Sequence, residues 1–181
     1  MPNKQNLNVK KRIMFNKDED YYFITYNILV FLDILGCVSE KSKFLDYTKL
    51  SYIIPFISNH LLLDLIVDFS QTNHLPNNEE IELLRETYYK SRLKLKLVTS
   101  ILFTLERNEY IALQKNLTRN TIDIWIRKDK IPESFFNPSL YRIEIEHTKK
   151  LREVSPRIRT LTVNTLLDQL FGNKGVTVWQ V

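Results

Sequence analysis

Apolar residues recur at helical spacing through most of this chain. Between Tyr21 and Val38 the apolar positions fall three or four residues apart, a spacing that predicts a helix. These positions lie on more than one side of the helix, so other elements are expected to surround it. We therefore predict that residues 21–38 form the central helix of the fold.

Residues that favour helix starts mark further helices in the first half of the chain. Asp46 is a suitable N-cap for a helix through Ile53, which Pro55 is expected to interrupt or kink. Asn59 can cap the helix that follows. Residues 71–78 are polar and contain a proline, so they form the clearest internal boundary. We therefore expect short, capped helices before this boundary.

The stretch from Leu83 to Lys128 is the most informative part of the sequence. Asn78, followed by several glutamates, is expected to start its first helix, because acids favour the positive end of a helix dipole. The polar residues 90–92 indicate a short break in this helix. A second helix is predicted over 93–107.

The second helical run has a competing interpretation. Residues 92–97 alternate between basic residues and leucine, which is a strand pattern, yet apolar residues four apart continue to Leu105 and favour a helix. Two β-rich runs follow, at 110–115 and 121–127, with a polar loop of hairpin length between them. Helix, turn, helix and hairpin in this order are typical of a winged-helix module.

The last third of the chain is expected to be mostly helical. Residues 140–151 are predicted to form an exposed, highly charged helix, and residues 161–171 form an amphipathic helix that Gly172 stops. The tail, residues 176–181, has a β-like pattern that would suit an edge strand.

These patterns predict a mainly α fold with a small β-hairpin, built as a winged-helix-like module with additional N- and C-terminal helices. We expect a flexible basic arm at 1–19, an acidic helical part at 20–72, and the winged-helix-like module at 78–130. C-terminal helices and a tail fill 131–181. All of these are expected to belong to one compact unit.

Charge is distributed unevenly along the chain. The net charge is +5, but residues 18–84 hold three basic against eleven acidic residues, net −8. Residues 85–130 hold eleven basic against five acidic residues, net +6. An acidic part joined to a basic part indicates two faces with different partners, one of which could be a polyanion.

Basic residues at the start of the second predicted helix suit DNA binding, because that helix enters the major groove in a helix-turn-helix. Lys90 and Lys94 share one stripe of a helix, and Arg92 and Lys96 share another. Such residues can equally form a solvated surface, and winged helices also dock proteins. The candidate nucleic-acid contacts are Lys90, Arg92, Lys94, Lys96, Arg119, Arg127 and Lys128.

Catalytic chemistry finds little support in the sequence. The only cysteine, Cys37, follows an apolar helix and is interpreted as a core residue. His60, His74 and His147 are far apart and lack ligand spacing, and three glycines cannot build a phosphate-binding loop. We predict no catalytic site, no metal site, no cofactor and no enzymatic activity. A cytoplasmic location without membrane association is expected, because the apolar runs are short and carry acids.

Three pieces of the sequence carry a resemblance to a known family. They are Leu32-Asp33-Ile34-Leu35-Gly36, then Leu45-Asp46-Tyr47-Thr48-Lys49-Leu50 running into Ile53-Ile54-Pro55, and Tyr89-Lys90-Ser91-Arg92-Leu93 leading to Leu105-Glu106-Arg107-Asn108-Glu109-Tyr110-Ile111. In these pieces, which span about the first two-thirds of the chain, the protein resembles the middle components of bacterial ABC-three-component defence systems, including the accessory subunit of Lamassu-type systems.

The resemblance implies a non-catalytic accessory subunit of an SMC-like (ABC) ATPase complex acting against phage or plasmid DNA. Such a subunit would bridge the ATPase and an effector, often a nuclease, and could contact double-stranded DNA. The alternative is a stand-alone winged-helix DNA-binding transcriptional regulator.

Overall fold

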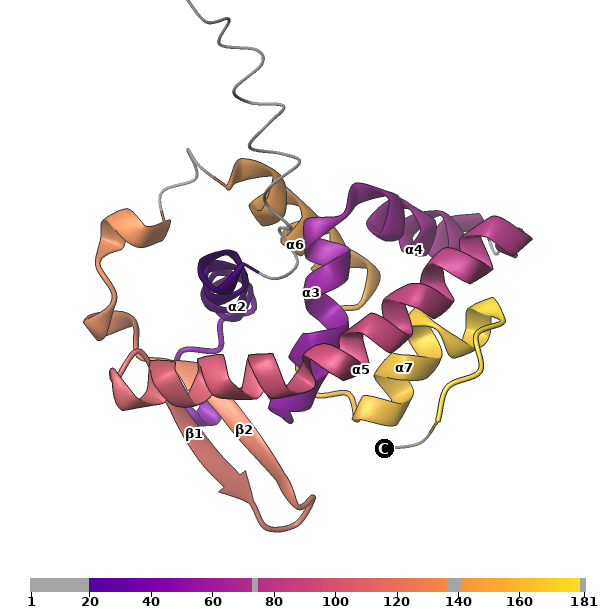
Figure 1. Cartoon of the computed structure of the whole chain (residues 1–181). Coiled ribbons are helices and arrows are strands. Elements are labelled where there is room, and N and C mark those ends of the chain that lie inside the picture. Colours follow the sequence, from indigo (N-terminus) through magenta and orange to yellow (C-terminus); the bar gives the residue numbers. More distant parts are fainter. Residues whose placement is uncertain (1–19, 73–74, 137–140, 180–181) are drawn as a thin grey trace, which may run out of the picture.

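The computed structural model describes residues 20–72, 75–136 and 141–179 (Figure 1). The predicted basic arm at 1–19 and His74 lie outside these residues. The fold is mainly helical with one antiparallel hairpin, as predicted. Its elements are α2 (Tyr21–Ile34), α3 (Leu50–Ser58), α4 (His60–Thr72), α5 (Asn78–Arg107), β1 (Ile111–Asn116), β2 (Thr121–Ile126), α6 (Arg142–Val154) and α7 (Val163–Leu170), with short 3-10 turns between them.

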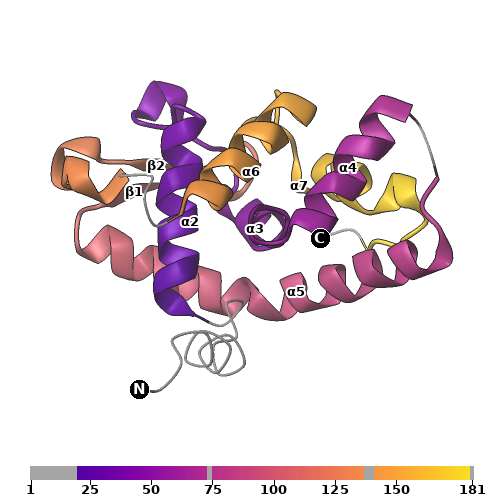
Figure 2. The same ribbon diagram turned by 90° about the horizontal axis from the view of Figure 1, so that it is seen from above.

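Helix α5 is the longest element and differs most from the prediction. It runs for 30 residues without interruption, so the break predicted at residues 90–92 is wrong. Ser91 is buried, and its hydroxyl donates to the carbonyl of Thr87 (2.8 Å). A serine that bonds back to the preceding turn keeps its polar group satisfied inside a helix. Figure 2 shows α5 running along one side of the molecule.

The start of α5 is capped one residue earlier than predicted. Asn77 is the N-cap, and its side chain accepts from the backbone N–H of Glu80 (3.0 Å). The Glu80 carboxylate accepts in return from the N–H of Asn77 (2.7 Å), which completes a capping box. Asn78 is therefore the first residue of the helix rather than its cap.

The two-stranded hairpin lies where the sequence predicted it, and one residue from an earlier part of the chain bridges to it. Strands β1 and β2 pair antiparallel, with Ile111 opposite Ile126 and Asn116 opposite Thr121. Phe44 forms a bridge with Ile124 on the other side of β2, through two backbone hydrogen bonds of 2.8 and 2.9 Å. The hairpin is therefore joined to the chain that leads into α3.

Helix α2 is central, as its apolar pattern predicted. Its residues from Ile28 to Leu32 are all buried, and α3, α5, α6 and β2 lie around it (Figure 1). The helix ends at Ile34, before the predicted Val38, and Gly36 follows with a positive φ of 69°. Because this backbone conformation favours glycine, the chain can turn there at little cost.

The predicted caps of the next helices are largely confirmed. The Asp46 side chain accepts from the N–H of Thr48 (3.1 Å) and caps a 3-10 turn that leads into α3. Pro55 lies inside α3, which continues to Ser58. Asn59 accepts from the N–H of Leu61 (3.0 Å) at the start of α4. These caps set the directions of the short helices.

No single described helix is long and apolar enough to cross a membrane. Residues 47–58 and 60–72 are long and apolar enough only when the two segments are combined, and the chain bends by 99° between them.

The chain after α7 is not a strand in the part that the structure describes, so the edge strand predicted for the tail is wrong there. Residues 176–179 instead lie against α5. The backbone N–H of Trp179 donates to the Tyr88 hydroxyl (3.0 Å), and the Trp179 ring lies 5.7 Å from the ring of Tyr89. A buried tyrosine hydroxyl thus anchors the C-terminal segment to the long helix.

Candidate interaction surface

One face of α5 is exposed along its length and carries apolar and basic side chains together. Its members are spaced three or four residues apart, so they fall on one side of the helix. We call this face the outer stripe. It consists of Arg85, Tyr89, Leu93, Lys96, Ser100, Phe103 and Arg107.

The apolar members of the outer stripe are exposed. Leu93 is 81% exposed, Phe103 51% and Tyr89 43%. The opposite side of α5 is buried against the core, where Tyr88 and Leu102 pack. A helix with one buried face needs only polar residues on the other, so large apolar residues there indicate a contact surface.

The basic residues of α5 have different surroundings. Arg85 is paired with Glu82, and Lys90 with Glu86 (2.7 Å). The Arg92 guanidinium lies 5.4 Å from the Trp179 ring centroid, a cation–π arrangement. Arg92 and Trp179 therefore lie beside Tyr89, near one end of the outer stripe.

Two further basic residues of the stripe, Lys96 and Arg107, differ from Arg85. Among the described residues, the structure gives Lys96 and Arg107 no ion pair. Both are exposed, so their positive charges face solvent and can attract an anionic partner.

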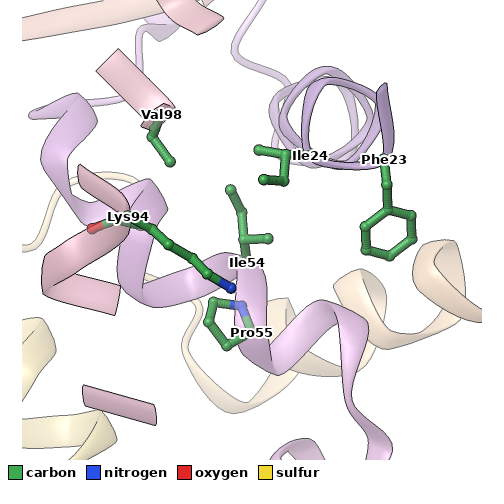
Figure 3. A pocket seen from close by; sticks show the side chains of 7 residues that line it. Phe23, Ile24, Ile54, Pro55, Lys94 and Val98 are labelled. Carbon is green, nitrogen blue, oxygen red and sulfur yellow. The ribbon is translucent and has the colours of Figure 1, made fainter. Parts of the chain in front are cut away.

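Lys94 lies on another side of α5 and borders an open cleft between α2, α3 and α5 (Figure 3). The lining of the cleft is mainly apolar, and Figure 3 shows the Lys94 side chain extending toward Pro55. The lining residues are Phe23, Ile24, Ser51, Ile54, Pro55, Lys94 and Val98.

The predicted nucleic-acid residues of the hairpin region are separate from this cleft. Arg119 lies in the hairpin turn and donates to the carbonyl of Thr160 (3.4 Å). Arg127 follows β2 and is exposed. Lys128 is paired with Asp33 at the end of α2 (2.8 Å). Arg119 and Lys128 therefore each bind another part of the protein.

The seven predicted nucleic-acid residues are thus distributed over several places. Arg92 and Lys96 lie along the exposed side of α5, whereas Lys94 faces the cleft. Because α5 is continuous, Lys90 and Lys94 are neighbours on its surface, and so are Arg92 and Lys96, as their four-residue spacing predicts. Their role in nucleic-acid binding stays a prediction.

Sequence reasoning missed a buried polar centre that fixes the hairpin. Asp123 on β2 is fully buried and accepts from the N–H of Asp46 (3.1 Å) and from the amide of Asn116 (3.0 Å). Lys43 completes the arrangement with an ion pair at 3.2 Å. The alternation in β2 placed Asp123 on a polar face, and nothing local showed that its partners lie far away in sequence.

Lys49 forms a second part of this buried centre. Its ammonium donates to the carbonyls of Ile158 (2.9 Å), Arg159 (3.1 Å) and Leu161 (2.9 Å). Burial lowers the pKa of Lys49 to about 7, while nearby Asp46 acts in the opposite direction. The residue ties the chain before α7 to the start of α3.

The cysteine and a buried histidine, Cys37 and His147, belong to the packed interior of the protein. Cys37 is buried, as predicted for a core residue, and burial raises its pKa to about 12. His147 forms a hydrogen bond with the carbonyl of Ile57 (2.7 Å). In the described part of the chain, no group of three His, Cys, Asp or Glu side chains could hold a metal ion.

Comparisons with known protein families, with curated proteins and with solved structures gave no match. The outer stripe, the cleft and the hairpin are therefore interpreted from their own geometry.

Proposed function

We propose that this chain is a non-catalytic accessory subunit of an SMC-like ATPase complex that acts against phage or plasmid DNA. The observation that carries the proposal is the outer stripe of α5, where exposed apolar and basic side chains share one face of a long helix. Aromatic residues and arginine are enriched at the centres of protein interfaces, and the stripe has both. The sequence resemblance supplies the identity of the complex.

The proposal includes a winged-helix-like arrangement. Its parts would be α2, the Phe44 segment, α3, α5 and the β1–β2 hairpin, with α5 as the helix that precedes the wing. The single β-bridge between Phe44 and Ile124 supports this, because it attaches the chain before α3 to the outer side of the two-stranded hairpin. Helix α4, between α3 and α5, would be an addition to that arrangement.

The test is co-expression with the neighbouring genes, followed by purification through a tag on this chain. We expect a coiled-coil ATPase subunit to co-purify in a fixed ratio and to remain bound through size-exclusion chromatography. A chain that elutes alone, with the ATPase expressed and folded, would refute the proposal. If this chain bridges the two other subunits, the effector should co-purify with the ATPase only when this chain is present.

The second candidate is a DNA-binding regulator, favoured by the exposed arginine that follows β2 and by the net charge of +6 over residues 85–130. This function requires duplex binding by the isolated chain, with log affinity falling steeply against log salt. Reversal of charge at Lys96 and Arg127 should then weaken binding strongly. An isolated chain that binds no duplex at low salt eliminates this candidate.

A further inference from the structure

We infer that the outer stripe of α5 docks one amphipathic helix of a partner subunit, and that this helix carries acidic residues about eleven positions apart with apolar residues between them. This inference deepens the proposed function and rests on it. It specifies the chemistry of the partner that the accessory subunit recognises.

The spacing of the stripe is that of a helix–helix contact. From Arg85 to Arg107 its members follow at intervals of four, four, three, four, three and four residues. Residues at such intervals form the seam along which two helices pack, and the apolar members of this stripe are Tyr89, Leu93 and Phe103. The stripe spans about 33 Å at roughly 1.5 Å per residue, which suits a partner helix of similar length.

The apolar part of the stripe is widened at one end by the C-terminal segment. Trp179 is 50% exposed, and its ring lies 5.7 Å from Tyr89 and 5.4 Å from the Arg92 guanidinium. Tyr, Trp and Arg are the residue types that dominate binding energy at interfaces. A partner helix would bury its apolar side chains here.

Charge selects the partner. Basic residues stand at three regular positions of the stripe, Arg85, Lys96 and Arg107, each eleven residues from the next. Arg85 already pairs with Glu82 of its own helix, whereas the charges of Lys96 and Arg107 face solvent. Carboxylates eleven positions apart on a facing helix would meet Lys96 and Arg107, with Phe103 packed between them. Electrostatic complementarity of this kind fixes register and orientation.

The same charges disfavour a second copy of this chain. In an antiparallel pair centred on Lys96, that lysine would face its own copy, and Arg85 would face Arg107. Like charges would oppose one another at every basic position, which is unfavourable at an interface. Double-stranded DNA is disfavoured by the exposed Leu93 and Phe103, because phosphates offer these side chains no apolar surface.

The experiment uses the purified complex of the full chain with its co-expressed ATPase subunit. One variant is Leu93→Ala with Phe103→Ala, and another is Lys96→Glu with Arg107→Glu. Both remove exposed side chains, so folding is expected to be kept and is checked by circular dichroism. Matched controls on α4 and α6 are Leu61→Ala with Ile143→Ala, and Lys149→Glu with Lys150→Glu, which alter exposed residues outside the stripe.

Each stripe variant is expected to raise the Kd for the ATPase subunit at least about tenfold, as truncation of central interface residues commonly does. The control variants should leave the Kd unchanged. A photo-crosslinking amino acid at position 100, in the middle of the stripe, should crosslink to a helical partner segment with the acidic and apolar spacing stated above.

The outcomes separate the two proposals. If the complex forms but the stripe variants bind like the wild type, this inference is overturned while the proposed function stands. Crosslinks from position 100 to a second copy of the chain, or to DNA, also overturn it. If no ATPase subunit binds the wild-type chain at all, both proposals fail together.

Discussion

Lys49 is a fully buried lysine whose ammonium has a backbone carbonyl for each of its three hydrogens. The aromatic ring of Phe44 lies beside this ammonium, with Nζ 4.2 Å from the ring centroid. Every hydrogen of the ammonium therefore has an acceptor. Removing the amine would lower the free energy of unfolding, because three backbone carbonyls would lose their hydrogen-bond donor. A buried unsatisfied carbonyl costs about 1–3 kcal/mol.

The lowered pKa of Lys49 makes stability depend on pH. Its folded-state pKa is about 7, against 10.5 for an ordinary lysine. Between these values the unfolded chain holds a proton that the folded chain has lost, so this group's contribution to stability rises with pH. We expect the free energy of unfolding of the wild type, minus that of Lys49→Met, to increase from pH 7 to pH 9.5.

Urea denaturation at several pH values measures this difference. Lys174, whose pKa burial lowers to about 8, is present in both proteins, so its contribution cancels. A difference that stays constant over the range would show that Lys49 keeps its proton in the folded state.

Cys37 is expected to resist alkylation in the folded protein. Burial raises its pKa to about 12 from an ordinary 9.0, which makes the reactive thiolate about a thousandfold rarer at neutral pH. Iodoacetamide should therefore label the native chain only as fast as it unfolds, and urea should accelerate labelling steeply. Fast labelling in buffer alone would contradict the buried placement of this thiol.

The continuity of α5 is the main feature of the fold at the level of elements. A proline inside a helix removes a hydrogen bond and clashes with the preceding turn, at a cost of about 3 kcal/mol or more. We expect Ser91→Pro to destabilise the protein by at least this amount, because Ser91 lies in the middle of α5. Chemical denaturation followed by far-UV circular dichroism measures the loss.

Ser91→Ala is the matched control for this substitution. It removes the hydroxyl that donates to Thr87 while preserving the helix, so a loss of only about 1 kcal/mol is expected. If Ser91→Pro were tolerated as well as Ser91→Ala, a turn at residues 90–92 would be the better description.

Sequence patterns were informative where the decisive contacts are local. Asn59 caps the helix beside it, and the hairpin follows from two alternating runs with a short polar loop. The break predicted at 90–92 is wrong because a run of three polar residues does not by itself interrupt a helix. Only the packed structure shows that Ser91 is buried and that its hydroxyl finds a partner within the same helix.

The candidate surface could be predicted only in part, for the same reason. The basic residues of α5 are visible in the sequence, but the exposure of Leu93 and Phe103 depends on which side of the helix faces the core. The buried state of Asp123 depends on Asp46, which is 77 residues away. Long-range pairings of this kind leave no local pattern.

At the scale of the whole molecule, the apolar core draws on nearly the entire described chain. It extends from Ile24 on α2 to Val176 beyond α7, and α5 packs on α3 across the boundary at residues 71–78. A core shared in this way should unfold as a unit. We expect one cooperative transition in urea, with the same midpoint by circular dichroism and by tryptophan fluorescence.

The two tryptophans make this comparison informative, because Trp125 lies on β2 and Trp179 lies against α5. A fragment of residues 78–181 provides the converse test. It would lack α2, α3 and the Phe44 bridge, so the buried face of α5 would lose most of its packing. We expect this fragment to show weak, non-cooperative unfolding, since tertiary packing supplies most helical stability. A fragment that unfolds cooperatively, or wild-type transitions that separate by probe, would instead establish two independently folding parts.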